Sequence, residues 1–122
     1  MAAKDELGRY GEELAARYLT GLGYTIIERN WHTTGGELDI VARDRDTTVF
    51  VEVKTRRSTG FGHPFEAITE QKLARLRRLA MMWMTERGVA RGAGRDRIRI
   101  DAVAILAPRE GAPSIEHLKA IG

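Results

Sequence analysis

Residues 36–56 read GELDIVARDRDTTVFVEVKTR, and this stretch decides the predicted fold. It contains two runs rich in valine and isoleucine, residues 37–43 and 48–55, separated by the polar Asp44-Arg45-Asp46 connection. Short β-branched runs joined by a polar turn are typical of neighbouring antiparallel strands. The stretch therefore predicts a hairpin, which continues an antiparallel meander begun by an earlier strand.

Outward from the hairpin, hydrophobic periodicity predicts the other elements. A helix over 5–22 is expected from apolar residues at spacings of three and four, namely Leu7, Tyr10, Leu14, Tyr18 and Leu22. The remaining expected elements are a strand over 24–31, a turn over 33–36, a loop over 56–63, a helix over 70–87 with Thr69 as its N-cap, a loop over 88–95, a strand over 96–106 and an edge strand over 114–121. The order α-β-β-β-α-β predicts one α/β domain spanning residues 1–122, with a mixed central sheet flanked by helices.

Composition narrows the class of protein. The chain has 122 residues, of which 43% are hydrophobic and 30% charged, and these proportions argue against disorder. No apolar run approaches the roughly 18–20 residues that span a bilayer, and the N-terminus lacks the apolar core of a secretion signal. Cysteine is absent, which excludes disulfides and thiolate metal ligands. We therefore expect a cytoplasmic protein with no membrane partner.

Charged residues in the second run of the hairpin carry the main functional signal. Alternation across a strand places Glu52 and Lys54 on one face and the neighbouring valines on the other. Asp39, on the preceding strand, can reach the same surface if the register suits. Charges on a sheet covered by helices are costly unless they pair or bind a metal.

These residue types suit a divalent metal and phosphodiester chemistry. Mg²⁺ or Mn²⁺ takes hard oxygen ligands and is held by one or two carboxylates plus substrate phosphate. Asp39, Glu52 and the backbone carbonyl of Val53 are the candidate ligands, and Lys54 can orient or activate a water. The alternative is an exposed cross-strand charge pair between Glu52 and Lys54.

Helix geometry favours one glutamate of the first helix as a further site residue. We expect Glu12 to lie on the flank of the apolar stripe and Glu13 to point nearly opposite to it. A flank position can reach the edge of a buried sheet, so Glu12 is the candidate. A solvent-exposed helix charge is the alternative for Glu12.

Basic residues provide candidate nucleic-acid contacts. The net charge is +3, and arginines crowd the C-terminal half of the chain. The candidates are Arg56, Arg57, Lys72 and Arg75. Solvated loop and helix surfaces are the alternative for these four. The three histidines show no zinc-ligand spacing.

Several motifs resemble a known family over nearly the whole chain. They are GRYGEELAARYL at 8–19, Gly23-Tyr24, Arg29-Asn30, GELDIVARD at 36–44, VFVEVKTR at 49–56, Phe61-Gly62, Glu66-Ala67, Lys72 and Ile100-Asp101. The chain resembles the YraN-type family of small bacterial proteins and, more broadly, the PD-(D/E)xK superfamily, with similarity to archaeal Holliday-junction resolvases. In place of the superfamily's leading Pro-Asp, Leu38 precedes Asp39.

The resemblance implies a restriction-endonuclease-like fold and a metal-dependent endonuclease that acts on DNA, with branched or recombination intermediates among its expected substrates. It implies Asp39, Glu52 and Lys54 as the metal and catalytic core, joined by a glutamate of the first helix. Two other classes remain open: a non-catalytic nucleic-acid-binding or accessory protein, and a structural protein whose carboxylates only form ion pairs. A homodimer also remains open, from the resemblance and from two methionines off the apolar stripe, Met81 and Met82.

Overall fold

The computed structural model describes residues 2–60, 62–88 and 97–122. Its elements follow one another as α1 (Ala2–Gly21), β1 (Thr25–Thr33), β2 (Gly36–Asp44), β3 (Thr47–Arg56), the 3-10 helix η1 (Pro64–Ala67), α2 (Glu70–Glu86), β4 (Arg97–Leu106) and β5 (Ser114–Leu118). The α/β class and each predicted helix and strand are confirmed to within a few residues. The expected loop over 88–95 beyond Gly88, and the expected strand start at Asp96, lie outside the described residues.

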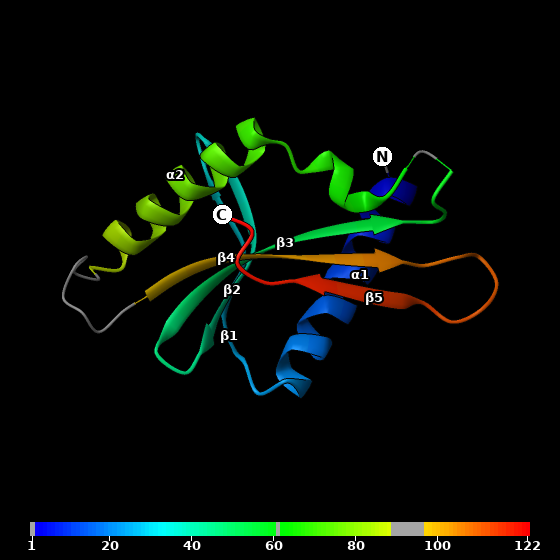
Figure 1. Ribbon diagram of the computed structural model, residues 1–122, viewed down its shortest axis with the longest axis horizontal. Helices are drawn as coiled ribbons and strands as arrows, with labels where there is room; N and C mark the ends of the chain where they lie inside the picture. Colours follow the sequence, from blue (N-terminus) through cyan, green and yellow to red (C-terminus); the bar gives the residue numbers. More distant parts are fainter. Residues whose placement is uncertain (1, 61, 89–96) are drawn as a thin grey trace.

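The five strands form one mixed sheet in the order β1-β2-β3-β4-β5 (Figure 1). The predicted antiparallel meander of β1, β2 and β3 is confirmed, and β5 pairs antiparallel with β4. β3 and β4 are parallel and are joined through α2. Ten residue pairs join β3 to β4, from Thr47↔Arg97 to Arg56↔Leu106. β3, which carries Glu52 and Lys54, is the central strand of the sheet.

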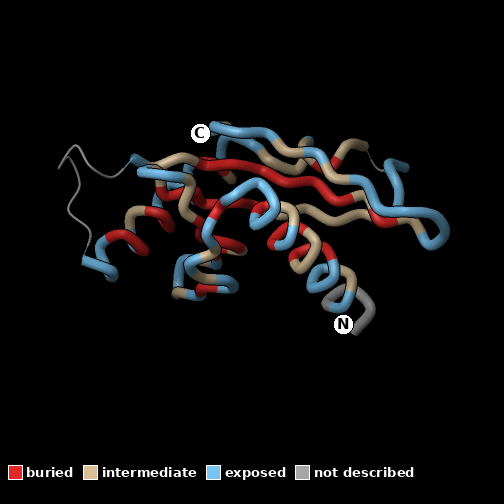
Figure 2. Tube along the Cα trace, turned by 90° about the horizontal axis from the view of Figure 1, so that it is seen from below, coloured by how far each residue is buried: buried red, intermediate tan, exposed pale blue. Residues whose placement is uncertain are grey.

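Two apolar clusters cover opposite faces of the sheet. One cluster joins α1 to the odd-numbered residues of β3, such as Val49 and Val51, and the other joins α2 to Phe50 between them. Because side chains alternate across a strand, α1 and α2 must lie on opposite faces. Figure 2 shows the buried residues along the central strands and along one side of each helix. No helix in the described part of the chain is both long and apolar enough to span a membrane.

The face that α1 buries matches the predicted stripe only in part. Leu7, Leu14 and Tyr18 pack against the core as predicted. Tyr10 and Leu22 are 46% and 49% exposed, whereas Ala15, Ala16 and Leu19 are buried. Small residues carry little hydrophobic signal in a sequence, but they let a helix backbone approach a sheet closely. The helix is therefore rotated relative to the expectation, and Glu12 lies on its buried face rather than on a flank.

Gly11 is a point of close approach between α1 and the sheet. A Cβ added there would lie 1.8 Å from Oγ1 of Thr55 on β3. Gly11→Ala is therefore expected to destabilise the protein by about 1–3 kcal/mol despite the better helix propensity of alanine, because the helix must shift. Urea unfolding monitored by circular dichroism measures this change.

Gly8 provides the matched control on the same helix. Nothing lies within 4 Å of a Cβ added at Gly8. Gly8→Ala should therefore stabilise the protein, by roughly 0.5–1 kcal/mol, through helix propensity alone. Equal effects of the two substitutions would contradict the close packing of α1 on β3.

Candidate functional site

β2 separates from β3 at Asp39, and this separation creates the site. The pairing of the two strands runs from Asp44↔Thr47 to Ile40↔Val51 and ends there. One step further, Asp39 comes opposite Glu52, and its Oδ2 accepts a hydrogen bond from the Val53 N–H at 2.9 Å. The N–H and C=O of one strand residue point to the same edge, so the Val53 carbonyl also faces the gap beside Asp39.

Glu52 is a buried carboxylate bound by two lysines. Its side chain is 6% exposed, and its Oε2 lies 2.8 Å from Nζ of Lys72 and 3.7 Å from Nζ of Lys54. Lys72 stands in the first turn of α2, where the Thr69 hydroxyl accepts its backbone N–H at 3.1 Å. The predicted N-cap is thus confirmed, and it helps to fix the turn that presents Lys72 to the sheet.

The buried charges shift one another's titration. Burial, and then the neighbouring Glu52 carboxylate, raise the pKa of Asp39 to about 7. Burial, and then the ammonium of Lys72, lower the pKa of Lys54, against the opposing attraction of Glu52. A carboxyl group with a raised pKa, Asp39, and an ammonium group with a lowered pKa, Lys54, thus lie on adjacent strands.

Glu12 reaches this region from α1. It is buried, with 8% of the residue exposed, so the alternative of an exposed helix charge is wrong. Its Oε1 accepts a hydrogen bond from Nδ2 of Asn30 at 2.8 Å and lies 3.4 Å from Nη2 of Arg29. Burial raises the pKa of Glu12, although Arg29 and Asn30 act in the opposite direction. Glu13 is more exposed and pairs with Arg17 and Arg29.

One open cleft of about 880 Å³ collects all the residues named as site candidates from the sequence. The four acid-base and metal candidates on its wall are Glu12, Asp39, Glu52 and Lys54, together with the backbone of Val53. The four basic candidates on its wall are Arg56, Arg57, Lys72 and Arg75. Lys72 is 20% exposed and ion-paired, so the surface-lysine alternative is wrong for it, whereas Arg57 and Arg75 are exposed.

The residues of the cleft fit a metal site that is completed by waters and a phosphate better than a site formed by protein ligands alone. Within the described residues, no group of three or more histidine or acidic side chains is placed to hold a metal ion. Mg²⁺, however, is usually bound by one or two carboxylates, with waters and substrate phosphate completing its shell. Asp39 and Glu52 supply such a pair, and a bound cation would offset the burial, and then the charge of Glu52, that raise the pKa of Asp39.

Asn30 lines the cleft but is not among the site candidates named from the sequence. It has a left-handed backbone, with φ of 54°, in the middle of β1, and it lines the cleft beside Glu12. Asparagine is depleted in strands and tolerates this conformation better than most residues. An asparagine within a β-branched and aromatic run was thus the signal that could have found it.

The raised pKa of Asp39 predicts how stability varies with pH in the metal-free protein. Between its ordinary pKa of 3.8 and about 7, the folded state keeps a proton that the unfolded chain has lost. The free energy of unfolding therefore falls as pH rises through this window, by an amount on the order of a few kcal/mol. Asp39→Asn removes this contribution, so the stability of the variant relative to the wild type should increase from pH 4.5 to pH 8. Thermal melts across this range in EDTA measure both stabilities. A stability difference that stays constant with pH would refute the prediction.

Fold and site together define a small α/β domain with a cleft lined by carboxylates and lysines at the centre of a mixed sheet. The chain belongs to a family that has been named but not characterised: the model of the uncharacterised protein family UPF0102 matches residues 11–105. The matched segment runs from Gly11 through β4, so it contains Glu12, Asp39, Glu52, Lys54 and Lys72.

Bacterial relatives resemble the chain over its full length. A UPF0102 protein of Beutenbergia cavernae is 54% identical over 122 residues, which is 100% of both chains. A UPF0102 protein of Streptomyces griseus is 53% identical over 99% of each chain, and one of an Arthrobacter species is 50% identical over 100% of each. These names state family membership and no activity.

Proposed function

We propose that this protein is a Mg²⁺- or Mn²⁺-dependent endonuclease that hydrolyses phosphodiester bonds in cytoplasmic DNA, on a restriction-endonuclease-like core. The observation that carries the proposal is the convergence of Asp39, Glu52 and Lys54 in one cleft, at the point where β2 leaves β3. The resemblance of GELDIVARD and VFVEVKTR to the PD-(D/E)xK pattern supports the same reaction. The lysines and arginines on the cleft wall suit a phosphate backbone.

Each side chain has a role in the proposed hydrolysis. Asp39, Glu52 and the Val53 carbonyl would hold the metal, and a metal bound there would supply Lewis-acid chemistry that polarises a phosphoryl oxygen and lowers the pKa of a water. Lys54, with its lowered pKa, orients that water and takes its proton. The water oxygen bonds to phosphorus, one P–O ester bond breaks, and solvent protonates the leaving oxygen. Lys72 binds a phosphate oxygen, and Glu12, held by Asn30, assists the metal or the water.

Metal binding tests the site independently of cleavage. Asp39→Asn and Glu52→Gln are each expected to weaken Mn²⁺ binding by more than about tenfold, because each removes one of two charged oxygen ligands. Isothermal titration of the purified proteins measures the affinity, and circular dichroism shows whether they remain folded. Glu37→Gln is the matched control, since Glu37 lines the same cleft but is exposed and pairs with His32.

Unchanged Mn²⁺ binding in both folded variants would rule out this site. A second function, a nucleic-acid-binding or accessory protein on the same fold, is favoured by one observation: the Glu52 carboxylate is ion-paired with both Lys54 and Lys72. That function predicts salt-sensitive DNA binding by the wild type in EDTA and no metal-dependent cleavage. If neither metal nor DNA binds, and Glu52→Ala only destabilises the fold, the carboxylates have a purely structural role.

A further inference from the structure

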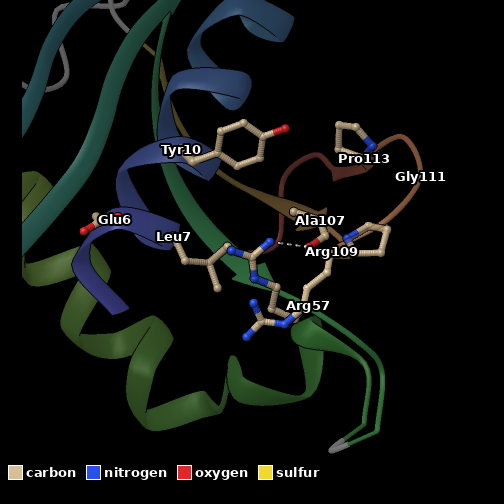
Figure 3. A pocket seen from close by; sticks show the side chains of 9 residues that line it. Glu6, Leu7, Tyr10, Arg57, Ala107, Arg109, Gly111 and Pro113 are labelled. Atoms are coloured by element: carbon tan, nitrogen blue, oxygen red, sulfur yellow. Dashed lines mark hydrogen bonds between the residues drawn. The ribbon is translucent and has the colours of Figure 1, made fainter. Parts of the chain in front are cut away.

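A second pocket lies beside the cleft, on the side of α1 and the β4–β5 connection. It has a volume of about 670 Å³, within the size range of small-molecule sites. Figure 3 shows Leu7 and Tyr10 of α1 on one side, Arg109 and Pro113 of the β4–β5 connection on the other, and Arg57 between them. Nη1 of Arg57 donates to the Ala107 carbonyl at 3.3 Å, which ties the end of β3 to the end of β4.

The pocket adjoins the cleft. Leu7 and Arg57 line both cavities, so the two share part of their wall, and a ligand long enough to extend past Arg57 can contact both. A nucleic-acid strand is a ligand of this kind, because its phosphates recur at short intervals along an extended backbone.

The chemistry of the wall matches a single nucleotide. Tyr10 is 46% exposed on this wall, and an aromatic face stacks on any base. Arg57 and Arg109 supply two guanidinium groups for phosphate, while Leu7, Pro108 and Pro113 supply apolar walls. Glu6 adds a carboxylate that can accept a hydrogen bond from an exocyclic amino group of a base.

We propose that this pocket binds one unpaired nucleotide next to the scissile phosphate, with its base against Tyr10 and its phosphate between Arg57 and Arg109. The inference rests on the proposed function of the cleft and narrows its substrate class. A base inside a uniform duplex is stacked and paired and cannot reach Tyr10. The preferred substrate is therefore DNA with an unpaired nucleotide beside the cleavage point, as at a flap, an overhang or a junction.

Fluorescence anisotropy in EDTA tests the pocket with two labelled probes, a blunt duplex and the same duplex with a short single-stranded flap. Tyr10→Ala is expected to weaken flap binding roughly five- to one-hundred-fold, the range given by base stacking on an aromatic ring, and to leave duplex binding unchanged. Tyr10→Phe, which keeps the stacking face, should bind the flap like the wild type. Arg109→Ala should weaken flap binding, whereas Arg78→Ala, on the exposed side of α2, should not.

An abasic site in the flap separates base stacking from a general effect. Removal of the base that reaches the pocket should weaken wild-type binding as much as Tyr10→Ala does, and the two changes together should add nothing further. The pocket is overturned if Tyr10→Ala weakens both probes equally, if it weakens neither, or if the wild type binds neither probe. The pocket is also overturned if the losses of affinity caused by Tyr10→Ala and by the abasic site are fully additive.

The results distinguish a failure of the pocket proposal from a failure of the proposed nuclease function. Flap-selective binding through Tyr10, in a protein that cleaves no DNA with Mg²⁺ or Mn²⁺, would retain the pocket and refute the nuclease. Metal-dependent cleavage that Tyr10→Ala leaves unchanged on flap DNA would retain the nuclease and refute the pocket.

Discussion

Lys54→Ala is expected to lower the rate of DNA cleavage by about a thousandfold or more while leaving DNA affinity within several-fold of the wild type. Removal of one group that stabilises transition-state charge costs roughly 10²–10³ in rate, and Lys54 also loses its place as proton acceptor. Single-turnover cleavage of an end-labelled substrate at saturating protein measures the chemical step alone.

Two further lysine variants sharpen this result. Lys54→Arg keeps a positive charge but cannot release a proton near neutral pH. Partial recovery of the cleavage rate in Lys54→Arg would therefore assign Lys54 an electrostatic role. No recovery would assign it the role of a base. Lys119→Ala removes an exposed lysine outside the cleft and should cleave normally. An equal fall in DNA affinity and cleavage rate in Lys54→Ala would instead make Lys54 only a binding residue.

Asp101→Ala is expected to destabilise the fold by about 3–5 kcal/mol, the cost of breaking a buried ion pair from one side. Asp101 is fully buried on β4 and receives hydrogen bonds from Arg99 at 2.8 and 3.1 Å, from His117 at 2.8 Å and from the Ala120 N–H at 3.0 Å. Burial alone would raise the pKa of Asp101, but these hydrogen bonds lower it below its ordinary value. The substitution removes the acceptor that a guanidinium, an imidazole and a backbone N–H share, although Arg99 keeps its ion pair with Asp44.

Urea unfolding measures the loss, and Asp46→Ala, in the exposed β2–β3 turn, is the matched control. Asp101→Ala should also lose the acid sensitivity that a lowered pKa confers. The folded protein gains stability from ionised Asp101 at neutral pH and loses it as pH falls from about 4 downward. A loss below about 1 kcal/mol would contradict a structural role for this network.

The elements were predictable because their signals are local. β-branched runs separated by short polar turns define β1, β2 and β3, and Thr69 marks the start of α2 through its own side chain. The face shared by Glu52 and Lys54 follows from the two-residue repeat of a strand, which tertiary packing rarely overrides. The salt bridge between Asp101 and Arg99, two residues apart on one strand face, follows from the same two-residue repeat.

The remaining features depend on contacts between distant segments. The buried face of α1 depends on the close packing of Gly11 on Thr55. Small residues give only a weak hydrophobic signal, so the sequence pattern does not indicate this contact. The bond from the Val53 N–H to Asp39 exists because β2 leaves β3 there, which no hydrophobic pattern encodes. The pocket at Tyr10 joins the first helix to a loop about 100 positions later in the sequence.

The central claim is that the cleft cleaves DNA through its carboxylates and lysine. The most direct test compares wild type and Lys54→Ala, purified side by side, on labelled linear, single-stranded, flap and four-way-junction DNA with Mg²⁺, Mn²⁺ or EDTA. We predict wild-type cleavage only with a divalent metal, strongest on substrates with an unpaired nucleotide, and its disappearance in the variant. Equal cleavage by both proteins would contradict the claim, because Lys54 would then not carry the activity. DNA binding by the wild type without any metal-dependent cleavage would also contradict it and would leave a binding module on this fold.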